Sequence, residues 1–531
     1  MARRGVREAG ALGVFLSSQF SDLSDPYRLR GMEAAVPRFL AALDQRERVL
    51  LHGDYDVDGV CSTAILALAL RRLGLACDTY VPDRLTEGYG VSAQAVRLAR
   101  ERGVRLLVTL DCGIVAHDEL EEARRAGIDC IVIDHHLLSE RGLPQALAVI
   151  NPKQEGRSSP GHEFCATGLA FKVAQALLGE PAQEFLGLAA LGTVADHAPL
   201  LGDNRIFVKR GLERLSSSRH AGIAALLALG RLAEKRLTVH DLSFQLAPRI
   251  NAVCRLGSAH TALDLLLCEQ PEEALKLAQE LERENRNRQS IERRAYGQAV
   301  RKVEREVAFA RDRVIVVWDE GWHPGVVGIL AARLARRFSR PAFVAGSYAG
   351  TWRGSARSVA GFDVAGALAL AREHLEEFGG HEAAAGFTAR PENFEALRRA
   401  LNAGARTSAG GGESGEPLEP DAEVALGALN ESFWRDLARL EPFGVGNPRP
   451  VFLTRSLTVQ QILRRTAKSV AFRVADRSGE MMCRLSLDVF RMPEEGMAFD
   501  LVYSPHGSVE RGIESVWLEA KRWAPASLSS V

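Results

Sequence analysis

The sequence predicts an α/β protein in three parts: a parallel-sheet lobe, a smaller α/β lobe joined to it by a long helix, and an all-β module. Three observations predict this architecture. Residues 48–139 alternate short apolar runs with helical runs, residues 269–310 form one long charged helical stretch, and residues 451–524 have the pattern of short strands separated by turns. Alternating strands and helices are typical of a parallel sheet with helices on both faces.

The composition limits the function classes. The 531 residues carry 67 basic and 67 acidic side chains, so any site for a polyanion must be a local patch. The eight cysteines include no CxxC pair, which argues against a structural zinc site or a disulfide framework. There is no apolar run of 18 residues. We therefore expect a cytoplasmic protein that is not inserted in a membrane.

Changes in composition along the chain predict its division into segments. Residues 168–229 are mostly helical in pattern, and residues 404–420 are rich in Gly and Ser, as flexible linkers are. We expect an N-terminal segment (1–45), a first lobe (46–268), a connecting helix (269–310), a second lobe (311–403), a linker (404–420) and the β module (421–531).

Acidic side chains follow several strands of the first lobe. In HGDYDVDG, residues 52–59, alternation along an extended strand end predicts that His52, Asp54, Asp56 and Asp58 face one side. Asp111 and the triplet from Asp134 to His136 follow two later strands. The carboxyl ends of parallel strands share one edge of a sheet, so these groups should converge there. Clustered carboxylates need a positive partner, and carboxylates with imidazole suit Mn²⁺ or Mg²⁺.

Each acidic motif also has a simpler interpretation. A calcium loop has similar acidic repeats, but this stretch lacks the distal Glu and leads directly into a helix. Asp111 alone could be a helix cap. In the DHH triplet, one imidazole can bind a metal ion while Asp134 fixes the tautomer of a ring. Asp196 lies in an otherwise apolar stretch, where a lone carboxylate needs a cation.

The motifs DYDVDG, LDCG, DHH and VADHAPL together resemble those of the DHH phosphoesterase superfamily. This resemblance implies two Mn²⁺ or Mg²⁺ ions. It also implies that Asp111 bridges the ions, that His136 faces the scissile phosphate and that Asp134 supports catalysis. The ligands that it implies are His52, Asp56, Asp58, Asp111, His135 and Asp196.

Motifs in the second lobe are similar to those of the DHH-associated domain: WHPGVVGILAARL, GSARS and GGHEAAAGF. Gly-rich turns with a hydroxyl and a guanidinium can hold a phosphate. VPDRLTEGYG, QLAPRINAVCRLG and LEPFGVGNPRPVF narrow the resemblance to the RecJ exonucleases, whose β module is an OB fold. The substrate-binding residues that it implies are Arg84, Arg255, Ser355, Arg357 and His381.

The β module has a local excess of positive charge. Between residues 455 and 477, six basic side chains accompany one acidic side chain, and Phe472 lies among them. Such a strip with an aromatic ring suits single-stranded nucleic acid, through counterion release and base stacking, although a merely solvated face has the same composition.

By resemblance, the chain is expected to degrade single-stranded DNA from 5′ to 3′ and to release mononucleotides during recombination and repair. It is expected to act as a monomer, with a helicase or single-strand-binding protein as partner. The alternatives are a nanoRNase or 3′-phosphoadenosine phosphatase and a non-catalytic scaffold. The sequence departs from the family pattern at Val253 and Cys254, which add bulk near the expected substrate path, at His197, and at Ala356, which could stiffen the phosphate turn.

Overall fold

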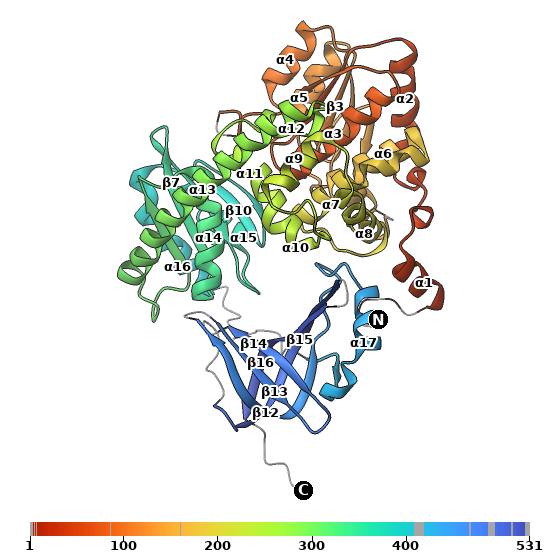
Figure 1. The fold of residues 1–531 in the computed structure, drawn as a ribbon. Coiled ribbons are helices and arrows are strands. Elements are labelled where there is room, and N and C mark those ends of the chain that lie inside the picture. Colours follow the sequence, from red (N-terminus) through yellow and green to blue (C-terminus); the bar gives the residue numbers. More distant parts are fainter. Residues whose placement is uncertain are drawn as a thin grey trace.

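Figure 1 shows the computed structural model of the chain, which contains three separate β-sheets. The structure describes residues 4, 6, 8–84, 86–159, 161–407, 419–466, 469–486, 494–510 and 513–525. Within these residues, no helix combines the length and the apolar character needed to cross a bilayer. All eight cysteines are free thiols.

The first lobe is built on a five-stranded sheet in the order β2-β1-β3-β4-β5, and every pair in it is parallel. The predicted parallel sheet is therefore confirmed. Its strands are β1 (Val49–Gly53), β2 (Cys77–Tyr80), β3 (Leu106–Leu110), β4 (Asp129–Ile133) and β5 (Ala148–Ile150). The order reverses between β1 and β3, and in open parallel sheets ligands bind at such a switch point, beyond the carboxyl ends of the strands.

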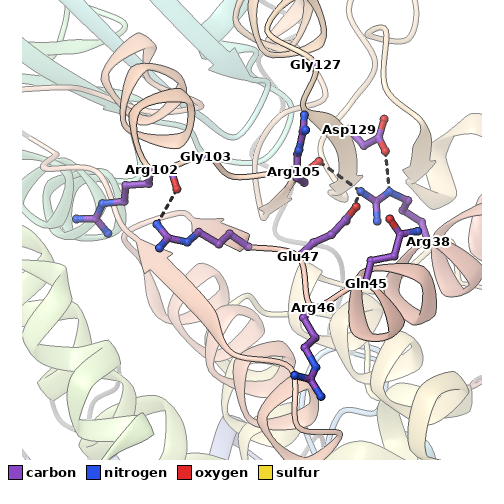
Figure 2. Close-up of a pocket in the computed structure, with 10 residues that line it drawn as sticks. Arg38, Gln45, Arg46, Glu47, Arg102, Gly103, Arg105, Gly127 and Asp129 are labelled. Atoms are coloured by element: carbon purple, nitrogen blue, oxygen red, sulfur yellow. Dashed lines mark hydrogen bonds and ion pairs between the residues drawn. The ribbon is translucent and has the colours of Figure 1, made fainter.

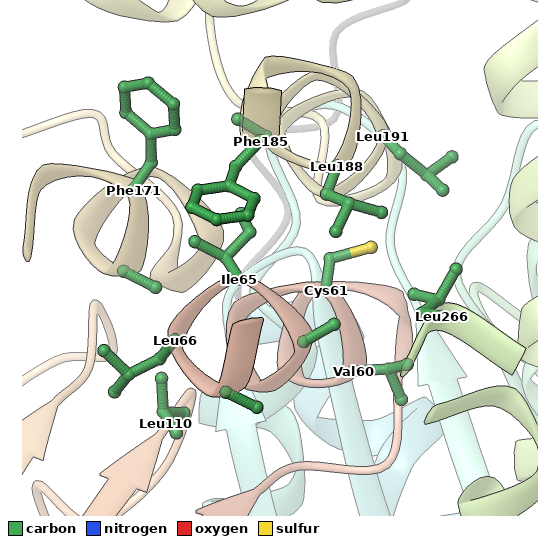
Figure 3. Close-up of a cluster of buried hydrophobic side chains, with 14 of the residues drawn as sticks. Val60, Cys61, Ile65, Leu66, Leu110, Phe171, Phe185, Leu188, Leu191 and Leu266 are labelled. Carbon is green, nitrogen blue, oxygen red and sulfur yellow. The ribbon is translucent and has the colours of Figure 1, made fainter. Parts of the chain in front are cut away.

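Helices cover both faces of this sheet. Val96 of α4 (Ala93–Glu101) and Leu120 of α5 (His117–Arg125) pack on one face. The other face is covered by α2 (Met32–Asp44), α3 (Val57–Arg72) and α6 (Ala166–Leu178). Figure 3 shows side chains of α3, among them Cys61 and Ile65, packed against Phe185 and Leu188. This packing holds α3 in place, so the first turn of the helix has a fixed position just after the end of β1.

Shorter helices complete the first lobe. Those before the sheet are α1 (Ala9–Ser17), η2 (Phe20–Asp22) and η3 (Pro26–Arg28). Those after it are η4 (Pro152–Ser158), η5 (Glu180–Phe185), α7 (Leu186–Ala195), α8 (Gly202–Ser216), α9 (Ala221–Leu229), α10 (Val239–Asp241), η6 (Leu242–Leu246), α11 (Ala247–Leu256) and α12 (Ala259–Leu267). The segment η6 is a π-helix that runs directly into α11.

The long helix α13 (Pro271–Glu306) leads from the first lobe to the second. The second lobe has a mixed sheet in the order β6-β7-β8-β10-β9, in which only β6 and β7 run parallel. Its strands are β6 (Ile315–Asp319), β7 (Ala342–Tyr348), β8 (Thr351–Arg357), β9 (Glu377–His381) and β10 (Ala384–Ala389). Its helices are α14 (Pro324–Phe338), α15 (Val364–Leu370), η7 (Arg372–His374), η8 (Pro391–Asn393) and α16 (Phe394–Thr407).

The C-terminal module is a barrel, because β12 pairs with both β13 and β15 in a six-stranded sheet. Its strands are β11 (Ala422–Glu423), β12 (Phe452–Arg465), β13 (Ser469–Ala475), β14 (Glu480–Ser486), β15 (Ala498–Glu510) and β16 (Ile513–Pro525). Before β12 come η9 (Leu426–Ala428) and α17 (Glu431–Arg439). The expected linker is partly helical, because α16 extends to Thr407, and residues 408–418 lie outside the described residues.

Candidate metal centre

Three carboxylates lie where neighbouring strands of the first sheet end. The backbone amides of Asp54, Asp111 and Asp134 continue the ladder, donating to the carbonyls of Leu110 at 3.0 Å, Ile133 at 3.0 Å and Ile150 at 3.1 Å. All three side chains are buried. The strand ends at the switch point therefore bring together acids that are about 80 positions apart in the chain.

Two further carboxylates belong to the first turn of α3. Asp56 caps this helix, since its Oδ1 accepts hydrogen bonds from the amides of Asp58 at 2.8 Å and Gly59 at 3.2 Å. Asp58 is held from the other side, because its two oxygens accept from the amides of Ala166 and Thr167, each at 2.8 Å. A Cβ at Gly59 would lie 2.4 Å from the carbonyl oxygen of Asp54, so only glycine permits this tight return of the chain.

Candidate ligand atoms within the described residues form three groups, in each of which the atoms lie within 4.8 Å of one another. The groups are Asp54, Asp56 and Asp111; Asp58, His135 and Asp196; and Asp111, His135 and His136. The Nε2 atom of His135 lies 3.2 Å from Oδ1 of Asp111 and 3.7 Å from Oδ2 of Asp58, and its Nδ1 lies 3.9 Å from Oδ2 of Asp196. Asp111 and His135 are each shared by two groups.

The structure differs from the sequence prediction at His52. His52 belongs to none of the three groups, and Asp54, which was not predicted as a ligand, joins Asp56 and Asp111 instead. The imidazole of His52 is fully buried within β1, packs on the ring of Tyr80 and has Nδ1 3.6 Å from Sγ of Cys112. The predicted alternation of side chains along an extended strand does not apply to Asp58, because α3 begins at Val57 and Asp58 is already helical.

The carboxylates strongly perturb one another. Burial first, and then the neighbouring carboxylates, raise the pKa values of Asp54, Asp56 and Asp111 above the usual range. The same two causes raise the pKa of Asp196 to about 8. Burial lowers the pKa of His135, which keeps this imidazole neutral and able to bind a metal ion. The protein thus holds five carboxyl groups close together, and His136 is the only cationic side chain among the grouped residues.

The donor set fits hard divalent cations. Oδ1 of Asp54 and Oδ1 of Asp111 are buried and have no hydrogen-bond partner in the described structure. Leaving such oxygens unpaired is costly, and a cation removes the cost. Carboxylate oxygens with one or two imidazole nitrogens, and no thiolate in any group, are the ligands of Mn²⁺ and Mg²⁺ rather than of a soft metal.

Asp111 has an unusual backbone conformation, with φ of 63°. This left-handed conformation is uncommon outside glycine, and it is tolerated best by Asn and Asp. It places the carboxylate directly after β3, where two ligand groups meet. Strain of this kind persists where the surrounding structure fixes it, often at functional sites.

His136 is oriented by two neighbours. Its Nδ1 lies 2.7 Å from Oδ1 of Asp134 and 3.0 Å from the hydroxyl of Tyr89, which also donates to the carbonyl of Asp111 at 3.3 Å. Burial opposes protonation of His136, but the hydrogen bond with Asp134 and the charges of the neighbouring carboxylates together outweigh it and raise the pKa to about 9. Nδ1 is therefore occupied, and Nε2 is the nitrogen left for a substrate. Tyr89 was not among the predicted site residues, although it lies in the VPDRLTEGYG motif that follows β2.

A group of guanidinium side chains forms at the boundary of the two lobes. Burial, and then the nearby Arg84, Arg288 and Arg357, lower the pKa of Arg255 to about 10. Burial and then Arg84 likewise lower the pKa of Arg357. Arg255 donates to the carbonyl of Gly325 at 3.1 Å, so it links α11 to the start of α14. Three of the predicted substrate-binding arginines therefore share one region, and Arg288, which was not predicted, lies near them.

The predicted phosphate turn of the second lobe is a strand. Ser355 and Arg357 lie on β8, and the hydroxyl of Ser355 accepts from a guanidinium nitrogen of Arg357 at 2.8 Å. Ala356 is buried between them in the core of the second lobe and stiffens no turn. His381 ends the edge strand β9 and is exposed; the described structure gives its imidazole no hydrogen bond or ion pair with these arginines.

The remaining departures from the family pattern have structural explanations. Val253 and Cys254 are buried in the core of the first lobe, so they add no bulk to an open path. His197 has φ of 59° and is exposed immediately after the end of α7. Histidine is among the non-glycine residues that tolerate this conformation, whereas a β-branched apolar residue would be strained there.

The barrel corrects one further expectation. Phe472 is only 1% exposed and packs in the barrel core, so its ring is not available for base stacking. Of the predicted basic strip, Arg464, Arg465 and Arg477 are exposed, while Arg455 pairs with Glu423 and Asp500 and Arg473 pairs with Glu480. Lys468 lies outside the described residues.

A pocket of about 730 Å³ lies at the opposite edge of the same sheet, where β1, β3 and β4 begin (Figure 2). Arginines dominate its lining, but Arg38 pairs with Glu47 and Asp129, and Arg48 donates to the carbonyl of Arg102 at the end of α4. The helices α2, α4 and α5 all end here. Cations at helix C-termini offset the macrodipole, so these arginines are explained by local structure.

Comparison with known proteins agrees with this architecture. Residues 48–193 match the DHH family, N-terminal domain; residues 311–406 match the DHHA1 domain; and residues 420–522 match the RecJ OB domain. The single-stranded-DNA-specific exonuclease RecJ of Bacillus subtilis is 37% identical over 489 residues, which cover 91% of this chain and 62% of the relative. The chain thus spans less than two thirds of that protein.

Two other proteins extend the comparison. The RecJ exonuclease of Dickeya dadantii is 35% identical over 495 residues, covering 87% of this chain and 84% of the relative. The crystal structure of RecJ in complex with Mn²⁺ from Thermus thermophilus superimposes with a TM-score of 0.84 at 30% identity, covering 98% of this chain and 74% of that chain.

Proposed function

The chain belongs to the RecJ family, and from this premise we propose that it is a single-stranded-DNA-specific exonuclease. It hydrolyses phosphodiester bonds from the 5′ end, releases 5′ mononucleotides and serves recombination and repair. The observation that carries the proposal is the carboxylate of Asp111, which is shared by two groups of hard ligand atoms at the switch point of the sheet. Such sharing is what a pair of adjacent divalent cations needs.

We assign two Mn²⁺ or Mg²⁺ ions to this centre, held by Asp54, Asp56, Asp58, Asp111, His135 and Asp196. The unpartnered oxygens of Asp54 and Asp111 support this assignment. When bound, two such cations lower the pKa of water and stabilise the charge that develops on a phosphate under attack. His52 stays outside the ligand set in this proposal, because it belongs to none of the three groups and its imidazole packs against the ring of Tyr80.

His136 contacts the scissile phosphate in the proposed mechanism. Asp134 accepts from Nδ1, so the imidazole carries its proton on that atom and presents Nε2 to the substrate. The charge of Asp134 also favours the imidazolium, which can pair with a phosphate oxygen. Asp134 is thus a positioning residue, because it acts through His136.

The arginine group binds the 5′ end of the strand. The charge of Arg84 lowers the pKa of both Arg255 and Arg357, so these guanidinium groups lie close enough to favour an anion among them. Guanidinium groups bind phosphate oxygens through paired hydrogen bonds. Ser355 and His381 are proposed as additional contacts on the second lobe. A 5′-phosphate held here would fix the direction of degradation.

A comparison of Asp111→Asn with the native protein tests the proposal. Asn tolerates the left-handed backbone at this position, so the fold should survive while the negative ligand is lost. End-labelled single-stranded DNA, duplex DNA and a dinucleotide are each incubated with Mn²⁺ and with chelator. The native protein should release mononucleotides only from the 5′ end of single strands and only with metal, and Asp111→Asn should lose turnover rather than raise KM.

The same assay separates the alternatives. Hydrolysis of the dinucleotide alone would indicate a nanoRNase or 3′-phosphoadenosine phosphatase, and strand binding without cleavage would indicate a scaffold. Turnover by Asp111→Asn at the native rate would overturn the shared-ligand assignment. We further propose that the protein is a monomer of the cytoplasm, where a helicase or single-strand-binding protein supplies the strand. Its eight free thiols are consistent with a reducing compartment.

A further inference from the structure

The loop that carries Asp196 is short and lies under a turn of the C-terminal module. We call residues 196–201 the aspartate loop and residues 443–447 the FGVGN turn. The aspartate loop joins α7 to α8. Its first part is tied to the end of α7, because the amides of Asp196 and Ala198 donate to the carbonyls of Gly192 at 2.9 Å and Thr193 at 3.1 Å.

The FGVGN turn contacts the second half of the aspartate loop. The amide of Leu200 donates to the carbonyl of Val445 at 2.7 Å. A Cβ at Gly446, where φ is 73°, would lie 2.9 Å from Cβ of Pro199, and one at Gly444 would lie 2.7 Å from Cδ1 of Leu200. Both glycines therefore permit a close approach, which a larger residue would disturb more at Gly446, against the rigid ring of Pro199, than at Gly444, against the flexible end of Leu200.

The turn itself is firmly held. Gly444 and Asn447 exchange two backbone hydrogen bonds, at 2.9 and 3.1 Å. The side chain of Asn447 is fully buried, donates to the carbonyls of Leu440 and Pro442, and accepts from Arg4 at 2.7 Å. Because every polar atom of this amide is used, the turn is a rigid support and not a loose connection.

A buried arginine fixes the same joint from the first lobe. Arg205 of α8 is 1% exposed, and it donates to the carbonyl of Phe15 at 2.8 Å and to that of Glu441 at 2.7 Å. Its guanidinium also lies 3.7 Å from the ring centroid of Phe15. These bonds hold the start of the C-terminal module against α8, directly beyond the aspartate loop (Figure 1).

The aspartate loop has one other support on this side. Asn204, at the start of α8, donates to the carbonyls of Pro199 at 3.1 Å and Glu163 at 2.8 Å. The peptides around Pro199 are therefore held between Asn204 and the FGVGN turn. Only two residues separate Pro199 from Asp196, so a displacement at Pro199 has little chain in which to be absorbed before it reaches the carboxylate.

We propose that the FGVGN turn positions Asp196 for metal binding, so that docking of the C-terminal module and the affinity of the metal centre are coupled. This inference rests on the proposed metal site. Groups that orient a metal ligand without touching the metal commonly change affinity by 10–100-fold. Coupling of this kind is reciprocal, so metal binding in turn strengthens docking of the module.

The test uses glycine substitutions in the full chain and measures Mn²⁺ binding by calorimetry. Gly446→Ala introduces a left-handed alanine and a clash with the rigid ring of Pro199. Gly496→Ala is the matched control, because Gly496 has φ of 77° in the same module and nothing within 4 Å of an added Cβ. We expect Gly446→Ala to weaken one Mn²⁺ site by about 10-fold, and Gly496→Ala to leave both sites unchanged within about twofold.

A second variant keeps the test decisive if Gly446→Ala does not fold. Gly444→Ala meets only the mobile end of the Leu200 side chain, so its effect on Mn²⁺ affinity should lie between those of Gly446→Ala and Gly496→Ala. Circular dichroism confirms the fold of each variant. Equal Mn²⁺ affinities across the folded variants would overturn the inference.

Asp196→Asn separates this inference from the proposed function. If Gly446→Ala acts through Asp196, then combining it with Asp196→Asn should weaken Mn²⁺ binding no further than Asp196→Asn alone. Additive losses would mean that the turn acts elsewhere and would overturn the inference. Failure of the native chain to bind Mn²⁺, or an Asp196→Asn variant with native affinity, would instead overturn the metal assignment.

Discussion

The Oδ1 atom of Asp134 lies 2.7 Å from Nδ1 of His136 and also accepts hydrogen bonds from the amides of His135 at 2.8 Å and His136 at 3.1 Å. Its second oxygen accepts from the amide of Ile114 at 3.0 Å. A single buried carboxylate thus fixes the backbone of both histidines and the ring of His136.

This relationship predicts the effect of Asp134→Asn. The amide removes the charge that favours the imidazolium, and its nitrogen would face the amide of Ile114, donor against donor. We expect kcat for release of mononucleotides to fall about 10–100-fold with a smaller change in KM. In a His136→Ala background the same substitution should cause little further loss, and a full additional loss would contradict the positioning role.

Arg357 is predicted to distinguish the two kinds of 5′ end. In Arg357→Gln the charge-assisted contact with a terminal phosphate is lost, which is typically worth about 1.5–3 kcal/mol. We expect kcat/KM to fall about 10–100-fold on 5′-phosphorylated strands and much less on 5′-hydroxyl strands. Arg353→Gln, on the same strand but stacked on Tyr348, is the matched control and should affect neither substrate. An equal fall in kcat/KM on 5′-phosphorylated and 5′-hydroxyl strands would disprove a terminal-phosphate site.

Phe472 is predicted to stabilise the fold of the barrel and not to stack on the bases of single-stranded DNA. Phe472→Ala removes a fully buried ring and should cost about 3–5 kcal/mol of unfolding free energy in the barrel. Phe472→Leu retains most of the buried surface, so binding of single-stranded DNA, measured by fluorescence anisotropy, should stay near the native value. A large loss of affinity in a stably folded Phe472→Leu protein would restore the stacking hypothesis.

Asp241 is predicted to give stability that depends on pH. Burial alone would raise its pKa, but hydrogen bonds from Lys235 and Thr238 outweigh burial and lower the pKa below the usual value. The folded chain therefore binds this proton more weakly than the unfolded chain does. The resulting stabilisation is present above about pH 4, near the unfolded pKa, and it disappears as the pH falls through the folded pKa.

Asp241→Asn should accordingly lower the thermal unfolding midpoint at pH 7. At low pH, where the native carboxylate is protonated, the midpoints of the native protein and the variant should lie closer together. The loss at pH 7 should correspond to about 1–3 kcal/mol. Asp436→Asn, whose carboxylate is exposed and pairs only along its own helix, is the control and should change the midpoint little. A pH-independent difference for Asp241→Asn would refute the ionic contribution.

The approach of the candidate metal ligands could be predicted from sequence because parallel topology fixes where strand ends meet. Once residues 48–139 were assigned to a parallel sheet, Asp111 and His135 had to approach the DYDVDG stretch. The exact ligand set could not be obtained in this way. His52 and Asp54 have the same strand parity, but β1 ends at Gly53, so His52 lies within the strand and Asp54 lies beyond its end with the other carboxylates.

The errors in the other two domains have a common physical origin. A pattern of residues does not show which side of a strand faces the core, and Phe472 was assigned to the surface because basic residues surround it. The glycines near Ser355 suggested a turn, but Gly354 lies on a strand, where a Cβ would meet the ring of Phe387 at 2.1 Å. Glycine there serves close packing within a sheet.

The hydrogen bond between Arg4 and Asn447 joins residues 443 positions apart in the chain. Because a chain is synthesised from its amino-terminal side, Arg4 cannot form this bond until Asn447 has emerged from the ribosome. Arg205, synthesised midway, likewise lacks its later carbonyl partners during that interval. The contact between the first lobe and the C-terminal module therefore forms completely only after residue 447 has been synthesised.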